Sequence, residues 1–103
     1  MSSIPAPQIG QFVKVRQGRD RDKIAVIVGI ADAKFVHIAD GDKRKFDQPK
    51  RKNVLHLELQ HAISHEVVQS LSESGRVTNS KLRYVIAKYA DRLAAANGNE
   101  KGE

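Results

Sequence analysis

The apolar residues of the first sixty positions recur in short runs with the period of β-strands. One run covers residues 12–15, and residues 24–30 form a nearly continuous β-branched stretch, typical of a central strand buried on both faces. A third run covers residues 35–39, and leucines alternate with polar residues over 53–59, as expected of a half-buried closing strand. Short strands at spacings of about ten residues predict a small β-barrel over residues 9–60.

Two charged segments interrupt these strands and are expected to project from the barrel. Gly18 ends the first strand and is followed by the fully charged residues 19–23. Asp40 and Gly41 form a pair that tolerates positive φ and favours a tight hairpin. The hairpin leads into residues 43–52, of which six are basic and one is acidic.

The remainder of the chain has the three-to-four-residue period of helices. Ser64 is a candidate N-cap for a short helix that ends near Gly75, and a second helix is expected to begin with Thr78, Asn79 or Ser80 as its cap. The apolar face of this second helix consists of Leu82, Val85, Ile86, Tyr89, Ala90 and Leu93. That face is covered either by the protein's own domain or by a partner protein. Alternatively, the basic residues of this helix extend an RNA-binding surface; they are Lys81, Arg83, Lys88 and Arg92. The helix is expected to fade in an alanine-rich stretch before Gly98.

These patterns predict a β+α fold, in which a small barrel is followed by two C-terminal helices. Residues 1–8, with two prolines, are expected to form a flexible arm. Residues 9–60 then form the barrel and residues 61–96 a helical extension. Residues 97–103 are expected to form a disordered tail.

The charge is unevenly distributed along the chain and favours a polyanionic partner. Eighteen Lys and Arg against twelve Asp and Glu give a net charge of +6, with a pI near 9.8. Residues 1–60 contain twelve basic and seven acidic residues, whereas residues 61–103 contain six and five. A nucleic acid bound by the barrel is therefore the first hypothesis. The alternative is a solvated basic hairpin whose charge prevents edge pairing.

Several classes of protein are disfavoured by what the sequence lacks. The absence of Cys excludes disulfides and thiolate metal sites, and no apolar run approaches the ~20 residues of a membrane span. The first residues lack the pattern of a signal peptide, so a cytoplasmic protein is expected. No nucleophile elbow, P-loop or dinucleotide motif occurs, and we expect no enzymatic activity, cofactor or small-molecule substrate. His61 and His65 are spaced as metal ligands could be, but without further ligands they do not predict a metal site.

Four segments of the chain resemble a known family. They are residues 10–15 (GQFVKV), 18–28 (GRDRDKIAVIV), 40–45 (DGDKRK) and 49–57 (PKRKNVLHL). The first two resemble the KOW motif of ribosomal proteins and transcription elongation factors. The last two resemble small bacterial KOW-domain RNA-binding proteins, which are similar to a large-subunit ribosomal protein of archaea and eukaryotes. The resemblance implies an SH3-like barrel whose first loop contacts structured RNA, with large-subunit ribosomal RNA as the expected partner and ribosomal proteins as further ones.

The candidate RNA-binding residues follow from the resemblance and from the chemistry of phosphate recognition. They are Arg16, Gly18, Arg19, Arg21, Lys23, Lys43, Arg44, Lys45, Lys50, Arg51 and Lys52. Gly18 allows close approach of the backbone to a phosphate, and the arginine fork can bond two phosphate oxygens. The family commonly has a glycine where this chain has Asp22, which leaves residues 19–23 at only +1, whereas residues 43–52 carry +5. The main RNA contact is therefore expected from 43–52.

Two interpretations remain open for this region. Phe46, between the two basic triplets, either packs as a half-buried hairpin residue or stacks on a base. The barrel as a whole either binds RNA or docks on a protein of the ribosome or the transcription machinery, with the basic segment steering the approach.

Overall fold

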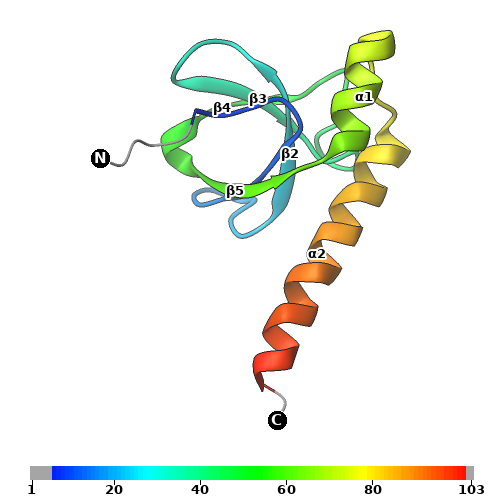
Figure 1. Ribbon diagram of the computed structural model, residues 1–103. Coiled ribbons are helices and arrows are strands. Elements are labelled where there is room, and N and C mark those ends of the chain that lie inside the picture. The colour runs from blue at the N-terminus through cyan, green and yellow to red at the C-terminus, as the bar shows by residue number, and fades with distance from the viewer. Residues whose placement is uncertain (1–5, 102–103) are drawn as a thin grey trace.

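The structure of the protein is a computed structural model that describes residues 6–101, with side chains described through residue 96. It contains five strands, one 3₁₀ turn and two α-helices (Figure 1). The elements in chain order are β1 (Gln11–Val15), β2 (Ile24–Ile30), β3 (Phe35–Ala39), β4 (Lys50–Asn53), η1 (Val54–His56), β5 (Leu57–Ile63), α1 (His65–Ser74) and α2 (Asn79–Lys101). The predicted β+α class is confirmed.

The strands form one antiparallel sheet in the order β4-β3-β2-β1-β5. The sheet curls strongly, and both helices lie on one side of it (Figure 1). The predicted barrel is not closed, because β4 and β5 are the two edges and no ladder joins them within residues 6–101. The chain passes from one edge to the other through η1, whose 3₁₀ turn leaves no strand there to pair.

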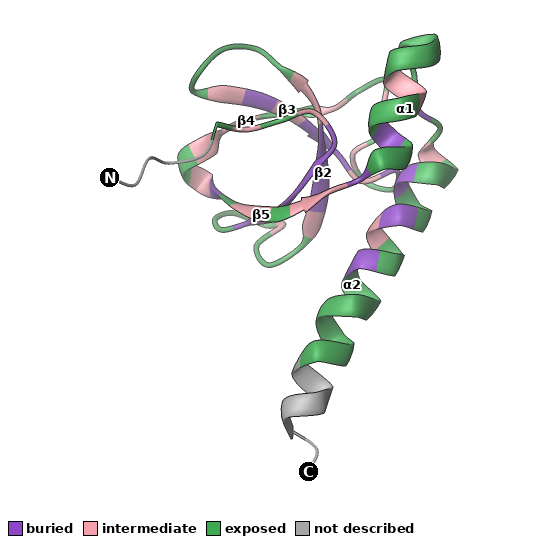
Figure 2. Ribbon diagram, in the orientation of Figure 1, coloured by how far each residue is buried: buried purple, intermediate pink, exposed green. Residues whose placement is uncertain are grey.

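The sheet has a hydrophobic core on each face, which the burial pattern makes visible (Figure 2). Strand β2 contributes to both, since Ala25 and Ile27 pack on the inner face of the curl and Val26 packs toward the helices. The prediction of a central strand buried on both faces is therefore confirmed. On the helix side, the rings of Phe12 and Tyr89 stack with centroids 4.3 Å apart.

Both predicted helix starts are confirmed by their caps. Ser64 Oγ accepts a hydrogen bond from the Val67 backbone N–H (3.3 Å), and α1 ends at Gly75, whose φ is 75°. Thr78 caps α2, because its Oγ1 accepts from the Lys81 backbone N–H at 3.0 Å.

Helix α2 uses only its first half for packing. Leu82, Val85 and Tyr89 are buried against the sheet and α1, so this part of the face is covered by the protein's own domain. From Ala90 to Ala96 every residue is exposed, and the helix runs past the edge of the sheet (Figure 2). It extends to Lys101 instead of fading before Gly98, consistent with the high helix propensity of alanine.

The ends of the chain were predicted to be an arm and a tail. Residues 1–5 of the arm and residues 102–103 of the tail lie outside the described residues. Within the described part, the Gln8 backbone N–H donates to Gln11 Oε1 at 3.0 Å.

The segment between β3 and β5 differs from the prediction. The connection after Ala39 is not a tight hairpin but spans residues 40–49, and the predicted strand over 53–59 is divided between β4, η1 and β5. Asn53 Oδ1 accepts from the Leu55 backbone N–H (2.9 Å) and so caps the 3₁₀ turn, which leaves Leu55 77% exposed instead of half-buried. Strand β5 then continues to Ile63, three residues past the expected end of the sheet region.

Gly41 holds the 40–49 connection against α2. Its φ is 80°, and a Cβ atom there would clash with the Asn79 carbonyl oxygen. Two hydrogen bonds depend on this close approach: Arg83 Nη1 donates to the Gly41 carbonyl oxygen (2.7 Å), and the Phe46 backbone N–H donates to Asn79 Oδ1 (2.8 Å). Only glycine fits at this position without strain.

Candidate nucleic-acid interface

The loop between β1 and β2 is closed by its own backbone bonds. The Asp22 N–H donates to the Val15 carbonyl oxygen at 2.7 Å, and the Lys23 N–H donates to that of Asp20 at 3.0 Å. Two residues of the loop have positive φ, Gly18 at 96° and Asp22 at 72°. Asp22 occupies the place where the resembled family commonly has glycine, and its left-handed backbone gives the physical reason for that preference. The loop exposes Arg19, Arg21 and Lys23.

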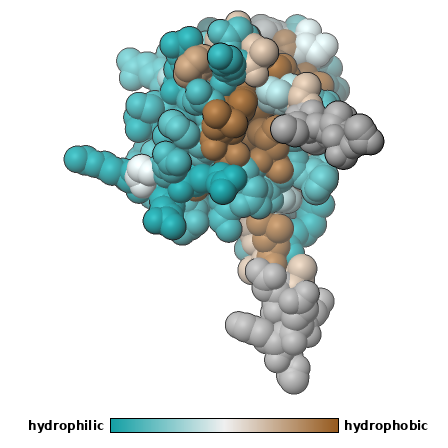
Figure 3. All heavy atoms as spheres, turned by 90° about the vertical axis from the view of Figure 1, so that its left-hand side faces the viewer, coloured by the Kyte–Doolittle hydropathy of each residue, from teal (hydrophilic) through white to brown (hydrophobic). Residues whose placement is uncertain are grey.

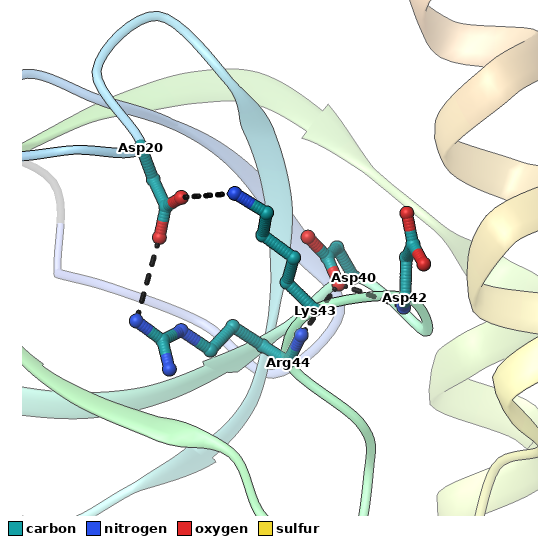
Figure 4. A network of polar contacts seen from close by, with 5 residues as sticks. All are labelled: Asp20, Asp40, Asp42, Lys43 and Arg44. Atoms are coloured by element: carbon teal, nitrogen blue, oxygen red, sulfur yellow. Dashed lines mark hydrogen bonds and ion pairs between the residues drawn. The ribbon is translucent and has the colours of Figure 1, made fainter.

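A second loop is organised by Asp40 and joined to the first by Asp20 (Figure 4). Asp40 Oδ1 accepts from the backbone N–H groups of Asp42 (2.8 Å) and Arg44 (2.9 Å). Asp20 pairs with Arg44 at 3.5 Å and with Lys43 at 4.0 Å. The two segments predicted to bind RNA are therefore neighbours in space.

Strand β4 divides its three basic residues between the two faces of the sheet. Lys50 and Lys52 are opposite Ile38 and Val36, which belong to the core inside the curl, whereas Arg51 is opposite an outward residue of β3. Lys52 reaches the first loop, because a Cβ atom placed on Gly18 would lie 3.9 Å from its Nζ.

We call residues 16–23 and 40–52 together with Arg83 the basic cluster. Arg83 was considered only as one of four basic helix residues that could extend the RNA surface, and it lines one surface hollow of about 250 Å³ together with Lys23 and Lys43. It lies on α2, 31 positions beyond Lys52, so only the docking of the second loop on that helix brings it here.

The basic cluster accounts for the whole net charge of the protein. It contains eleven Lys and Arg against five Asp, a net charge of +6, and the rest of the chain is balanced at seven of each sign. One polar atom of the cluster, Arg44 Nε, is buried without a hydrogen-bond partner among the described residues.

Two of the predicted binding residues turn away from the others. Arg51 lies over the Phe35 ring, 4.1 Å from its centroid, on the outer face of β3 and β4. Near it, backbone N–H groups of Lys34 and Phe35 donate to Asp32 and lower the pKa of that carboxyl below 3.8, with a smaller contribution from Arg51. Arg16 lines a groove beside η1.

That groove is lined mainly by apolar residues. It encloses about 610 Å³ between the segment that contains Pro7 and the strand β5, and Leu55 and Leu59 line it. Figure 3 shows a hydrophobic patch surrounded by hydrophilic side chains on the face of the molecule that carries η1. Leu55 is the most exposed large hydrophobic residue of the described part.

The remaining sequence candidates have ordinary structural positions. Phe46 is half-buried and packs against the core on the helix side. His61 lies in β5 and His65 begins α1, so the two do not share a helix face. Among the side chains of residues 6–96, no three of the metal-binding types come together.

Fold and charge together define a small protein with one curled antiparallel sheet, two helices on one side of it, and all its net charge in one cluster. No protein-family model matches the chain. The chain belongs to the same family as a Bacillus subtilis (strain 168) protein named "Putative ribosome-binding protein YbzG". The two are 45% identical over 71 residues, which cover 69% of this chain and 96% of the relative. In the part of the chain that the structure describes, no helix is long and apolar enough to cross a bilayer.

Proposed function

We propose that this chain is a non-catalytic RNA-binding protein that associates with the large ribosomal subunit through its basic cluster. One observation carries the proposal: the fold brings together two charged loops, a basic strand and Arg83 of α2, and these parts jointly contain the net charge of +6. A concentrated positive surface without a catalytic constellation suits the phosphate backbone of RNA. The name of the B. subtilis relative, a ribosome-binding protein, agrees with this target.

The proposal includes the fold class. We propose that the curled sheet is an open SH3-like barrel of the KOW type. The five-stranded order and the 3₁₀ turn before the last strand support this assignment, as do the segments that resemble KOW proteins.

Binding is expected to follow shape and backbone charge more than base sequence. Arg19, Arg21 and Lys23 are exposed on one loop, and Lys43 and Lys45 on the other. If about five cations each neutralise one phosphate, the logarithm of affinity should fall against the logarithm of salt with a slope of roughly −4. Ribosomal RNA offers such a backbone in rigid, folded form.

The test is cosedimentation with large ribosomal subunits and, separately, with their extracted RNA over increasing salt. We expect both to bind the protein, and a variant with Lys23, Lys43 and Lys45 changed to Gln, three of these five cations, to lose most of the affinity and more than half of the salt slope. The matched control changes Lys34, Lys88 and Arg92 to Gln, which removes the same charge outside the cluster. An equal loss in both variants would contradict a localised site.

A second candidate function is favoured by the groove beside η1. An exposed leucine in an apolar groove is typical of a surface that contacts another protein. In this case the protein docks on a ribosomal protein, and the cluster steers it. Binding to intact subunits but not to extracted RNA, with loss on Leu55→Asp and little effect of the cluster variant, would establish this alternative.

A further inference from the structure

A hollow of about 510 Å³ lies between the second loop and the junction of the two helices. Phe46 and Asp47 line it from the loop, and Arg76 and Lys81 line it from the helix side. Phe46 and Asp47 belong to the segment 40–52, so the hollow adjoins the basic cluster.

The walls of the hollow combine the groups that bind a nucleotide. Phe46 packs on the core and also lines the hollow, so its ring is held by the fold and need not be ordered on binding. The hydrogen bond from its backbone N–H to Asn79 Oδ1 (2.8 Å) restricts the backbone at the same position. A fixed aromatic ring is a suitable platform on which any of the four bases can stack.

The opposite wall carries cations and hydroxyl groups. Lys81 Nζ donates to Ser70 Oγ at 2.9 Å, which holds the ammonium at the wall, and Arg76 is exposed. Neither cation forms an ion pair with a carboxylate among the described residues. The carboxylate of Asp47 also lines the hollow, which leaves it with a net charge of +1.

We infer that this hollow binds one unpaired nucleotide of the RNA, with the base against Phe46 and the phosphate near Arg76 and Lys81. The inference rests on the proposed RNA binding and assigns that function a preference for RNA with a bulged or looped-out nucleotide. The volume admits one nucleotide, and the hydroxyl groups of the wall suit the sugar and the edge of the base.

The experiment uses the full chain and two RNA hairpins, one with a single bulged 2-aminopurine and one fully paired. We expect both to bind, the bulged one about tenfold more tightly, with a change in 2-aminopurine emission on binding. The protein contains no Trp, so the emission reports on the RNA.

Two independent variants remove the two parts of the hollow. Phe46→Leu keeps an apolar residue on the core but removes the ring, and Arg76→Gln with Lys81→Gln leaves the core untouched. Each should lower the preference for the bulged hairpin to about twofold or less while binding of the paired hairpin changes little. Tyr84→Leu, which removes an aromatic residue that is 55% exposed on α2 outside the hollow, is the matched control and should leave the preference unchanged.

The outcomes separate the inference from the proposed function. Equal affinity for the two hairpins, or a preference that survives both variants, would overturn the inference and leave RNA binding intact. No binding of either hairpin would contradict both. Tight binding of free 2-aminopurine riboside 5′-monophosphate, with no preference between hairpins, would identify a site for free nucleotides and overturn the RNA assignment.

Discussion

Removal of the Asp20 carboxylate should strengthen RNA binding. Asp20 is the only carboxylate of the described part that forms ion pairs, and both partners, Lys43 and Arg44, are candidate phosphate ligands. Its side chain is 22% exposed, whereas those of Lys43 and Arg44 are 62% and 40% exposed. RNA must therefore compete with Asp20 for two cations. The substitution Asp20→Asn keeps the size of the side chain and ends the competition.

The magnitude follows from counterion release. If the change allows one further phosphate to be neutralised, the salt slope steepens by about 0.7 to 0.9. If the variant and the wild type have the same affinity at 1 M salt, the steeper slope makes the variant bind about five- to eightfold more tightly than the wild type at 0.1 M salt. The lost ion pairs are partly exposed, so the free energy of unfolding should fall by no more than about 1 kcal/mol.

The assay is a titration of extracted large-subunit RNA with the protein at several salt concentrations between about 0.1 and 1 M. This tenfold range is wide enough to determine the slope of log affinity against log salt. The control is Asp91→Asn, an identical charge change on an exposed position of α2. We expect it to alter the affinity much less than Asp20→Asn does. Weaker binding by Asp20→Asn with an unchanged slope would show instead that Asp20 serves the interface by holding the two loops together.

Further predictions concern the backbone and the titrating groups. Asp22→Gly should raise RNA affinity, measured by the same titration, because it removes a negative charge from the first loop. It should also raise the free energy of unfolding by about 0.5 kcal/mol in chemical denaturation, because glycine adopts the left-handed backbone without strain. Gly41→Ala should destabilise by about 2 kcal/mol and lower the Tm by about 10 °C in calorimetry; an unchanged Tm would contradict the close approach to α2. Tyr89→Phe should cost about 1 kcal/mol through the lost 2.8 Å bond to Gln60. Burial raises the Tyr89 pKa above 10.0, so stability should decline as pH rises through that pKa in the wild type and not in the variant. Because the pKa of Asp32 is lowered in the folded protein, its carboxylate stabilises the fold above pH 3.8, and this contribution is lost as the pH falls through the pKa of the folded state. Acid titration followed by circular dichroism should show this loss in the wild type and not in Asp32→Asn.

The helices and strands that are specified by residues close together in the sequence were predictable. Residues 24–30 become β2 with the expected bounds, because a β-branched run favours a strand in almost any context. Ser64 and Gly75 delimit α1, because capping needs only the local backbone. The uneven distribution of charge, from which the basic cluster follows, was also visible in the sequence.

The segment around Leu55 shows where local patterns were insufficient. Alternation predicted a buried leucine, but Asn53 caps a 3₁₀ turn at that point and turns the side chain outward. The turn lies where the chain passes from one edge of the curled sheet to the other, a requirement of the whole sheet that alternation along the sequence does not express.

By itself, the sequence determined the class of the fold, most of its elements and the excess of basic residues in the first sixty positions. Only the tertiary structure decided which cations lie together: it places Arg83 beside Lys23 and Lys43, turns Arg51 to the outer face, ties Lys43 and Arg44 to Asp20, and leaves β4 and β5 as unpaired edges. Period and capping are encoded within a few residues, whereas contacts between residues far apart depend on how sheet and helices bury their apolar faces together.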